Sequence, residues 1–342
     1  MGTHVVTVMK GDGIGPEVVD ATLLILEATG LSFVWDYQDI GLSALAGKGA
    51  LLPKEAIDSV KRNRVGLKGP TGTPIGGGHR SINVTLRTKL DLYANVRPLR
   101  SMLGVPTLFS NVDLLIFREN TEDLYIGKER LLLRRGKRVA EAVSRITEAG
   151  SLRFARYAYA YARAHDRKKM TIGHKANILK KTHGLFLEVS RAVGSEFPDI
   201  VTEDLIADNL GMQLVRELGR NPSRFDCLLL PNFLGDIFSD FCAGFTGGLG
   251  LAPGANIGEE YAIFEAVHGT APDIAGKGIA NPTALILSAA MMLDHLGERQ
   301  AGMKVRRAVE TVLREGVSVT GDVNPKNSVS TLAYARAVIT KL

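Results

Sequence analysis

Short apolar runs separated by turn-forming residues recur along the chain. Several have the length and aliphatic composition of buried strands: residues 4–9, 64–69, 113–117, 169–172, 225–230 and 262–264. Longer segments with apolar residues at helical spacing cover 16–29, 147–165 and 284–293, and the last of these is apolar enough to be buried. The pattern predicts a chain built from both strands and helices.

The first predicted strand, 4–9, runs into a glycine loop, Gly11–Glu17 (GDGIGPE), and then into a helix that suits Pro16 in its first turn. Strand, glycine loop and helix suggest a dinucleotide-binding fold, and Asp36 lies about twenty residues on, where an acidic ribose partner is expected. However, the spacing is G-x-G-x-G followed by proline, and not the G-x-G-x-x-G of the Rossmann fold. The loop therefore does not by itself establish a nucleotide site.

Two carboxylates follow the apolar run 225–230, in the stretch Pro231–Asp240 (PNFLGDIFSD). A helix that begins near Asp236 places Asp240 one turn further along the same face. The flanking residues are apolar, so the two carboxylates need a cation, and Mg²⁺ prefers such oxygen ligands. The alternative is a solvated outer helix face. The glycine-rich segment that follows, including 252–256, is expected to form turns.

Hydrogen-bond donors cluster in the first half of the chain. The loop Thr71–His79 exposes backbone N–H groups and suits an anionic or polar ligand, unless it is a plain linker. Arginine side chains bind carboxylates with two parallel hydrogen bonds, and several arginines at the ends of successive elements favour a ligand with several carboxylates. The donors in question are Ser81, Asn83, Arg87, Arg97 and Arg118.

Two further polar residues stand where predicted strands end. Lys175 follows the strand 169–172, and a lysine that is buried in such a position has a lowered pKa and can exchange protons. Asp208 follows 201–206 at a strand–helix junction. Both are candidates for chemistry, and both would otherwise be ordinary exposed residues.

The composition is that of a globular protein. The chain has 342 residues, 45% hydrophobic and 23% charged, which is enough for a large core and two domains. No apolar run is long enough to span a bilayer and the N-terminal residues form a first strand with no leader, so a soluble, cytoplasmic protein is expected. Cys227 and Cys242 are expected to pack as small apolar side chains.

The net charge of +6 is compatible with a nucleic acid or a small anionic ligand. Basic residues are scattered apart from Lys128–Arg138 (KERLLLRRGKR), which no aromatic platform accompanies. That run is expected to be a solvated hairpin or loop. Small anions are therefore favoured, and no nucleic-acid partner is expected. A gel shift across salt concentrations tests the nucleic-acid alternative.

Taken together, the motifs resemble the β-decarboxylating dehydrogenases, the family of isocitrate, isopropylmalate, homoisocitrate and tartrate dehydrogenases. GDGIGPEV, DLYANVRP, RENTEDLY, HKAN, GDIFSD, GGLGLAPGANIG and HGTAPDIAGKGIANP stand in family order along nearly the whole chain. The resemblance implies a mixed α/β fold of two domains that is not a Rossmann fold. It implies a large cofactor-binding domain, 1–93 plus 244–342, and a smaller substrate and dimerisation domain, 94–243, with a clasp-like segment near 126–146.

The resemblance also implies a nicotinamide cofactor, bound by two loops. The matching positions are Lys68, Thr71, Thr73, His268, Gly269, Thr270, Ala271, Asp273, Ile274 and Asn281. Asp273 can accept hydrogen bonds from both ribose hydroxyls and repels a 2′-phosphate. NADP-dependent relatives commonly have lysine and tyrosine where this chain has Asp273 and Ile274, so NAD is predicted.

For the chemistry, the resemblance implies that Arg87, Arg97, Arg118 and Asn177 bind the substrate. Asp236 and Asp240, joined by Asp208 across a dimer interface, match the Mg²⁺ or Mn²⁺ ligands. Tyr125 and the partner subunit's Lys175 match the proton-transfer pair. A homodimer with shared active sites, or a higher oligomer of it, is implied.

The substrate prediction rests on Ser81 and Asn83 in SINVTLR. In isocitrate enzymes a serine and an asparagine here donate to the third carboxylate, whereas isopropylmalate enzymes have apolar residues. An isopropyl group would leave both donors unpaired, at about 1–3 kcal/mol each. The predicted reaction is NAD-dependent oxidative decarboxylation of isocitrate. Homoisocitrate is the alternative, isopropylmalate is less favoured, and a non-catalytic regulatory subunit would be expected to have lost some of these residues.

Overall fold

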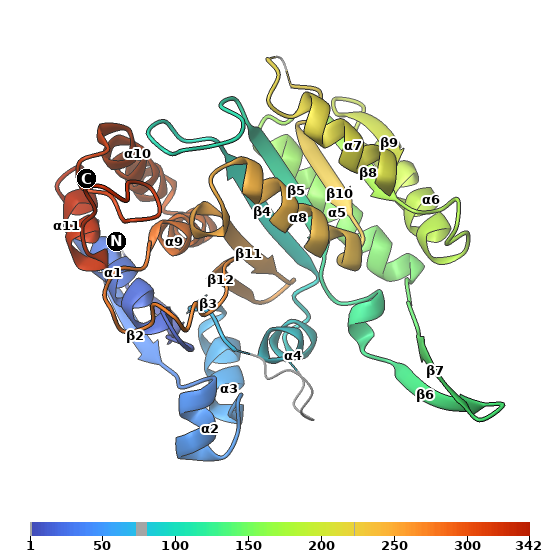
Figure 1. Cartoon of the computed structure of the whole chain (residues 1–342), viewed down its shortest axis with the longest axis horizontal. Coiled ribbons are helices and arrows are strands. Elements are labelled where there is room, and N and C mark those ends of the chain that lie inside the picture. Colours follow the sequence, from blue (N-terminus) through green and yellow to red (C-terminus); the bar gives the residue numbers. More distant parts are fainter. Residues whose placement is uncertain (1, 73–80, 222) are drawn as a thin grey trace. The chain divides into compact units, whose positions relative to one another are not determined.

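The computed structural model describes residues 2–72, 81–221 and 223–342, and its chain divides into two compact units (Figure 1). Unit 1 comprises Met1–Leu92, Arg97–Ser110 and Ala243–Leu342. Unit 2 comprises Tyr93–Val96 and Asn111–Cys242.

The segment Arg97–Ser110 belongs to unit 1, although the sequence placed it in the second domain. A backbone hydrogen bond from Phe109 to Phe245 joins this segment to the C-terminal part of the chain. Gly104, with φ +88°, lies so close to the Leu313 carbonyl that a Cβ would stand 1.9 Å from its oxygen. These contacts between distant parts of the chain are not visible in the local pattern.

Unit 1 is built on strands in the order β2-β1-β3-β12-β11. β1 (His4–Met9), β2 (Phe33–Tyr37), β3 (Val65–Lys68) and β12 (Ala262–Ala266) are parallel, and β11 (Pro253–Ile257) runs antiparallel to β12. β4 (Ala94–Arg100) has residues in both units. The helices of unit 1 are α1 (Gly15–Ala28), α2 (Leu42–Lys48), α3 (Lys54–Asn63), α4 (Ile82–Lys89), α9 (Thr283–His295), α10 (Arg299–Glu315) and α11 (Thr331–Ile339), with a short 3-10 helix, η2 (Leu249–Leu251).

The strand β11 corrects the expectation that residues 252–256 form turns. Proline, glycine and asparagine dominate this stretch, and all three are depleted in strands. Every residue of β11 is nonetheless buried and paired with β12. Tertiary burial overrides the local propensity here, and the antiparallel pair makes the sheet mixed. The fold-class prediction, mixed α/β and not Rossmann, is confirmed.

The centre of unit 1 is α9. All residues from Thr283 to Leu293 are buried, and the helix lies against β11 and β12 on one side and α10 and α1 on others. A helix surrounded by protein needs no polar face, which explains the uninterrupted apolar stretch in the sequence.

Unit 2 contains parallel strands in the order β5-β10-β8-β9. They are β5 (Asp113–Glu119), β10 (Cys227–Leu230), β8 (Lys169–His174) and β9 (Val201–Ile206), and the helices are α5 (Glu148–Ala164), α6 (Thr182–Ser195), α7 (Ala207–Glu217) and α8 (Asn232–Phe245). The carboxyl ends of parallel strands carry the loops from which binding residues usually come.

An antiparallel hairpin of β6 (Glu129–Arg134) and β7 (Lys137–Ala142) leaves unit 2 as an arm (Figure 1). It lies within the segment 126–146 and confirms the predicted hairpin. Leu131 and Leu133 are 60% and 78% exposed on it. Its expected role as a dimer clasp stays a prediction.

Both cysteines are free and buried, as the sequence suggested. Burial raises the pKa of both thiols, that of Cys242 to about 12, so neither is a reactive thiolate at neutral pH. Among the described residues, no helix combines the length and the apolar character that crossing a membrane requires.

Candidate active site

The carboxylate of Asp236 lies between a guanidinium and a phenol in unit 2. Arg118, in β5, and the hydroxyl of Tyr125, in the 3-10 helix η1 (Leu124–Ile126), both make short hydrogen bonds to it. The Arg118 guanidinium also stacks over the Tyr125 ring, 4.9 Å from its centroid. Arg118 is 1% exposed whereas the Asp236 side chain is 40% exposed, so the group opens to solvent on the carboxylate side. The structure thus brings three of the predicted site residues together.

Arg118 is held by residues of α8 that the sequence prediction did not include. The side-chain oxygen of Asn232, which is fully buried, accepts from Arg118 Nε at 3.1 Å and from a terminal nitrogen at 2.8 Å. One turn along the helix, Gly235 leaves room for the arginine, because a Cβ there would lie 2.5 Å from Arg118 Cγ. An asparagine two residues after the predicted strand 225–230 was the available sequence signal for this role.

The loop that carries Tyr125 is stabilised by its own carboxylates. Glu119 accepts from the backbone N–H groups of Thr121 and Glu122 at 2.8 and 2.9 Å. Glu122 accepts from the N–H of Thr147, the N-cap residue of α5, and Asp123 accepts from the N–H of Phe233 at 3.0 Å. Burial raises the pKa of Glu119, and its hydrogen bonds oppose that shift. The acidic residues of RENTEDLY therefore fix the loop and leave Tyr125 to face Asp236.

Lys175 and Asp208 form a second pair in unit 2. Lys175 Nζ donates to the Asp208 carboxylate at 2.8 Å, and this hydrogen bond lowers the pKa of Asp208. Lys175 follows β8 and Asp208 lies in the first turn of α7. The Asp208 side chain is 71% exposed. Asn177, two residues after Lys175, is also exposed.

The carboxylates suit a divalent cation only in part within one chain. Asp236 and Asp240 lie one turn apart on α8, and both offer the oxygen ligands that Mg²⁺ and Mn²⁺ prefer. In the part of the chain that the structure describes, no three His, Cys, Asp or Glu side chains gather into a metal-binding group. The α8 pair fits Mg²⁺, which is usually bound by one or two protein carboxylates together with water and substrate oxygens.

A buried charge cluster occupies unit 1. Lys68 Nζ donates to Glu265 at 2.5 Å, and the Arg87 guanidinium lies 3.6 Å from the same carboxylate. Asn256 donates to Glu265 at 2.8 Å. Burial alone would raise the pKa of Glu265, but the two cations hold it well below its usual range. Glu265 was not among the predicted site residues, and it joins two that were.

The remaining predicted substrate residues of unit 1 are near the start of α4 or in β4. Ser81 is the residue before α4, and its side chain makes no capping hydrogen bond among the described residues. The Thr71 hydroxyl donates to the Asn83 side-chain oxygen at 3.3 Å. Arg97 is buried in β4. Thr73 lies outside the described residues.

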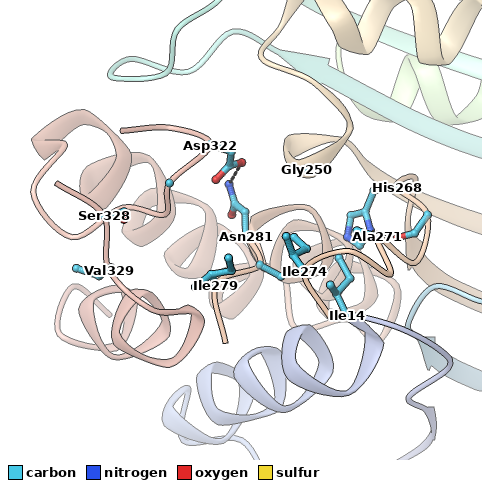
Figure 2. A pocket seen from close by; sticks show the side chains of 13 residues that line it. Ile14, Gly250, His268, Ala271, Ile274, Ile279, Asn281, Asp322, Ser328 and Val329 are labelled. Atoms are coloured by element: carbon cyan, nitrogen blue, oxygen red, sulfur yellow. Dashed lines mark hydrogen bonds between the residues drawn. The ribbon is translucent and has the colours of Figure 1, made fainter. Parts of the chain in front are cut away.

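A pocket of about 490 Å³ lies in unit 1, within the usual size range of ligand pockets (Figure 2). Five of the predicted cofactor residues line it: His268, Gly269, Ala271, Ile274 and Asn281. Residues that the sequence prediction missed complete it, chiefly Ile14, Gly250, Asp322, Ser328 and Val329. Figure 2 shows Asn281 turned toward Asp322, to which it donates at 2.9 Å.

The pocket is lined mainly by apolar side chains and glycines, with a few polar side chains among them such as His268, Asn281 and Asp322. His268 Nδ1 is 2.9 Å from the Gly269 carbonyl, and Nε2 is buried with no hydrogen-bond partner among the described residues. Burial lowers the pKa of His268, so the neutral ring donates from Nδ1 and keeps Nε2 as a free acceptor. The predicted Lys68, Thr71, Thr270 and Asp273 are not among the residues that line it; Asp273 is exposed next to Ile274.

The chain matches a family model described as isocitrate/isopropylmalate dehydrogenase over residues 5–338. A mitochondrial NAD isocitrate dehydrogenase catalytic subunit 5 of Arabidopsis thaliana is 46% identical over 97% of this chain and 87% of its own length. A chloroplastic 3-isopropylmalate dehydrogenase of Solanum tuberosum is also 46% identical, over 91% of this chain and 85% of its own. The crystal structure of isocitrate dehydrogenase from Methylococcus capsulatus has a TM-score of 0.94 and 50% identity, with 99% of both chains covered.

Proposed function

Because this chain belongs to the isocitrate/isopropylmalate dehydrogenase family, we propose that it catalyses the NAD-dependent oxidative decarboxylation of isocitrate to 2-oxoglutarate and CO₂. Overall similarity supports an oxidoreductase of this family but does not choose the substrate, since relatives with different substrates are equally identical to the chain. The site residues are what can distinguish the substrates.

The observation that carries the choice of isocitrate is the polar start of α4. Ser81 and Asn83 present a hydroxyl and an amide there, and a helix N-terminus favours a negative charge. A third carboxylate fits these donors, whereas an isopropyl group would leave them unpaired, at about 1–3 kcal/mol each. Homoisocitrate differs by one methylene and is the second candidate.

The chemistry of each side chain suggests its role in the proposed reaction. Arg118 is buried, permanently charged and fixed by Asn232, so it can hold a substrate carboxylate in one orientation. Lys175 Nζ is the proposed acceptor of the substrate hydroxyl proton. Tyr125 Oη is the proposed donor of the proton that carbon receives after CO₂ leaves.

The cofactor and the cation would supply the chemistry that these side chains lack. Bound NAD⁺ would supply the hydride acceptor for the alcohol carbon, and a bound divalent cation would supply a Lewis acid for the substrate oxygen. Asp236 and Asp240, with Asp208 of the partner subunit, are the residues proposed to hold the cation. His268, Ile274 and Asn281 are proposed to contact NAD⁺, and Asp273 to favour it over NADP⁺.

A second copy of the chain is proposed to complete each site. Phe233, Ile237 and Phe241 form a stripe at helical spacing on α8, each between 41% and 50% exposed. Met212 and Val215 of α7 are exposed to a similar degree. Apolar faces of this kind are typical of helix–helix subunit interfaces. The same helix carries Asp236 and Asp240, which supports a metal site beside the interface.

Assembly with a different chain is the alternative, because relatives are named as subunits of NAD isocitrate dehydrogenase. The monomer has a mass of 36.8 kDa, so a mass measurement on the purified chain shows whether it forms a dimer by itself or needs a different chain. An active homodimer supports the proposal. An inactive monomer that gains activity only with a second, different chain contradicts it.

The test of the reaction is NADH formation from isocitrate, homoisocitrate and isopropylmalate with Mg²⁺ or Mn²⁺, repeated with NADP⁺. We expect isocitrate with NAD⁺ to give the highest kcat/KM and chelation to abolish the activity. A preference for isopropylmalate would show that Ser81 and Asn83 do not select the substrate. No turnover of any of the three would reject the proposed reaction.

A further inference from the structure

Two buried histidines of unit 2 accept hydrogen bonds from the backbone N–H groups of Lys175 and Ala176, and neither is among the residues proposed to bind substrate or to react. His174 is the last residue of β8 and is 5% exposed, and His183 lies in the first turn of α6 and is 3% exposed. His183 Nδ1 accepts the backbone N–H of Lys175 at 3.0 Å. His174 Nδ1 accepts the next N–H, that of Ala176, at 3.1 Å.

These two contacts determine which ring nitrogens carry protons. A backbone N–H can only donate, so Nδ1 of each imidazole must be unprotonated. For His174 this leaves the proton on Nε2, which lies 3.3 Å from the Asp204 carboxylate. Arg191 Nε in turn donates to Asp204 at 2.9 Å. The His174 ring is therefore anchored from β9 as well as from its own strand.

The backbone of Lys175 is held on both sides of its Cα. Its N–H donates to His183, and its carbonyl accepts from the N–H groups of Ile178 and Leu179 at 3.0 and 2.8 Å. Its Nζ reaches Asp208 at 2.8 Å. A long flexible lysine can place its amine reproducibly only if the backbone from which it extends is fixed.

His183 suits an acceptor role at neutral pH. Burial lowers its pKa, as does His174, whereas the Asp123 carboxylate opposes the shift. The neutral ring keeps the Nδ1 lone pair that the Lys175 N–H needs. Because α6 begins at Thr182, the ring position is fixed by a helix and not by a loop.

We propose that His183 is a positioning residue for Lys175: its Nδ1 fixes the lysine backbone so that Nζ stands where it accepts the substrate proton. The inference rests on the proposed function, because Lys175 has this task only in that reaction. It assigns His183 no contact with substrate or cofactor.

The matched pair of variants is His183→Asn and His183→Gln. The asparagine side chain can place its oxygen near the position of Nδ1, whereas glutamine moves the acceptor one methylene further out. We expect His183→Asn to keep kcat within about threefold, and His183→Gln to lower it by about a hundredfold, as misplacement of a catalytic group by about 1 Å does. KM for NAD⁺ should stay unchanged in both. His165→Asn, at an exposed histidine, is the control.

Amide hydrogen exchange at Lys175 gives a second readout that does not need activity. Protection of this amide should be retained in His183→Asn and fall at least about tenfold in His183→Gln, while the amide of Leu228 in β10 keeps its protection. If His183→Gln does not fold, His183→Ala takes its place, with added imidazole expected to restore kcat.

Several outcomes overturn the inference. The first is an unchanged kcat in His183→Gln. The second is full activity of His183→Gln although the Lys175 amide has lost its exchange protection. The third is no recovery of kcat in His183→Ala on addition of imidazole. If the wild-type enzyme turns over none of the three substrates, the proposed reaction fails. The exchange data then still decide whether His183 fixes the Lys175 backbone.

Discussion

At the scale of single residues, buried carboxylates are held either by backbone N–H groups, as Glu119 is, or by cations. Glu265 is the clearest case, since its carboxylate faces both Lys68 and Arg87 and is further bound by Asn256. Two cations against one carboxylate leave an excess positive charge. That excess suits an anionic ligand, in agreement with the proposed tricarboxylate substrate.

The first prediction is that Glu265→Gln lowers both activity and stability. The amide keeps the shape but leaves Lys68 and Arg87 buried without a counter-charge, which is expected to cost about 3 kcal/mol. Urea unfolding measures this, and kcat/KM should fall at least about tenfold because both cations move. Glu310→Gln removes an exposed ion pair with Arg100 and should change neither. A fully active, equally stable Glu265→Gln enzyme would contradict the positional role of this carboxylate.

Asp36 has a structural task, although its distance from the first glycine loop suggested a ribose partner. Its carboxylate accepts from Ser59, Gln38, Asn63 and Arg62 and so joins β2 to α3. Partial burial raises the pKa of Asp36, but the four hydrogen bonds outweigh this and lower it to about 2.

The second prediction concerns the acid stability that Asp36 confers. A carboxylate with a lowered pKa stabilises the fold above its unfolded-state pKa, and this contribution is lost as the pH falls through the folded-state value. Asp36→Asn should therefore destabilise the protein by about 2 kcal/mol at pH 7. The difference from wild type should shrink between about pH 4 and pH 2. Denaturant unfolding across this range measures it, and a pH-independent difference would contradict the assignment.

At the scale of elements, α8 contributes residues to the proposed site and to an exposed apolar face. It begins with Asn232, which holds Arg118, and it presents Asp236 and Asp240 on one face and an apolar stripe along its length. Gly235 is the position where the helix and the arginine come closest.

The third prediction is that Gly235→Ala displaces Arg118. The added Cβ would stand 2.5 and 2.7 Å from Arg118 Cγ and Cβ, closer than real contacts, and the guanidinium would have to move. We expect kcat/KM for the substrate to fall about a hundredfold. Gly244→Ala is the control on the same helix, because a Cβ there meets nothing within 4 Å among the described residues. That variant should keep full activity and gain up to about 1 kcal/mol of stability.

At the scale of the whole molecule, we propose that each site needs two chains. Tyr125 contacts Asp236, and Lys175 contacts Asp208, but the two pairs are separate sets of hydrogen bonds within the chain. The proposed dimer would bring the two pairs together, because Lys175 and Asp208 would serve the partner's site.

The fourth prediction tests whether Tyr125 of one chain and Lys175 of the other form one site. Tyr125→Phe and Lys175→Met homodimers should each be inactive. When the two chains are unfolded and refolded together, half of the dimers are hybrids with one intact site, so about a quarter of wild-type activity should return. NADH formation and native mass measurement follow the recovery. Hybrid dimers without activity would mean that both residues act within one chain.

The sequence alone determined the elements whose signals are local. The strands that become β1 and β8, and the helix α9, follow from runs of apolar residues, because burial requires such side chains wherever the element lies. The motifs identified the family, and most proposed site residues follow from them.

Only the tertiary structure decided what depends on contacts between distant parts of the chain. Lys68 and Glu265 are separated by 197 residues, and Asp322 reaches the pocket from another segment of the chain. β11 is a strand because β12 buries it, against its own composition. The tasks of Asn232 and His183 likewise arise from partners on other elements. Such contacts leave no local pattern, because a residue's distant neighbours, and not its position in a motif, determine them.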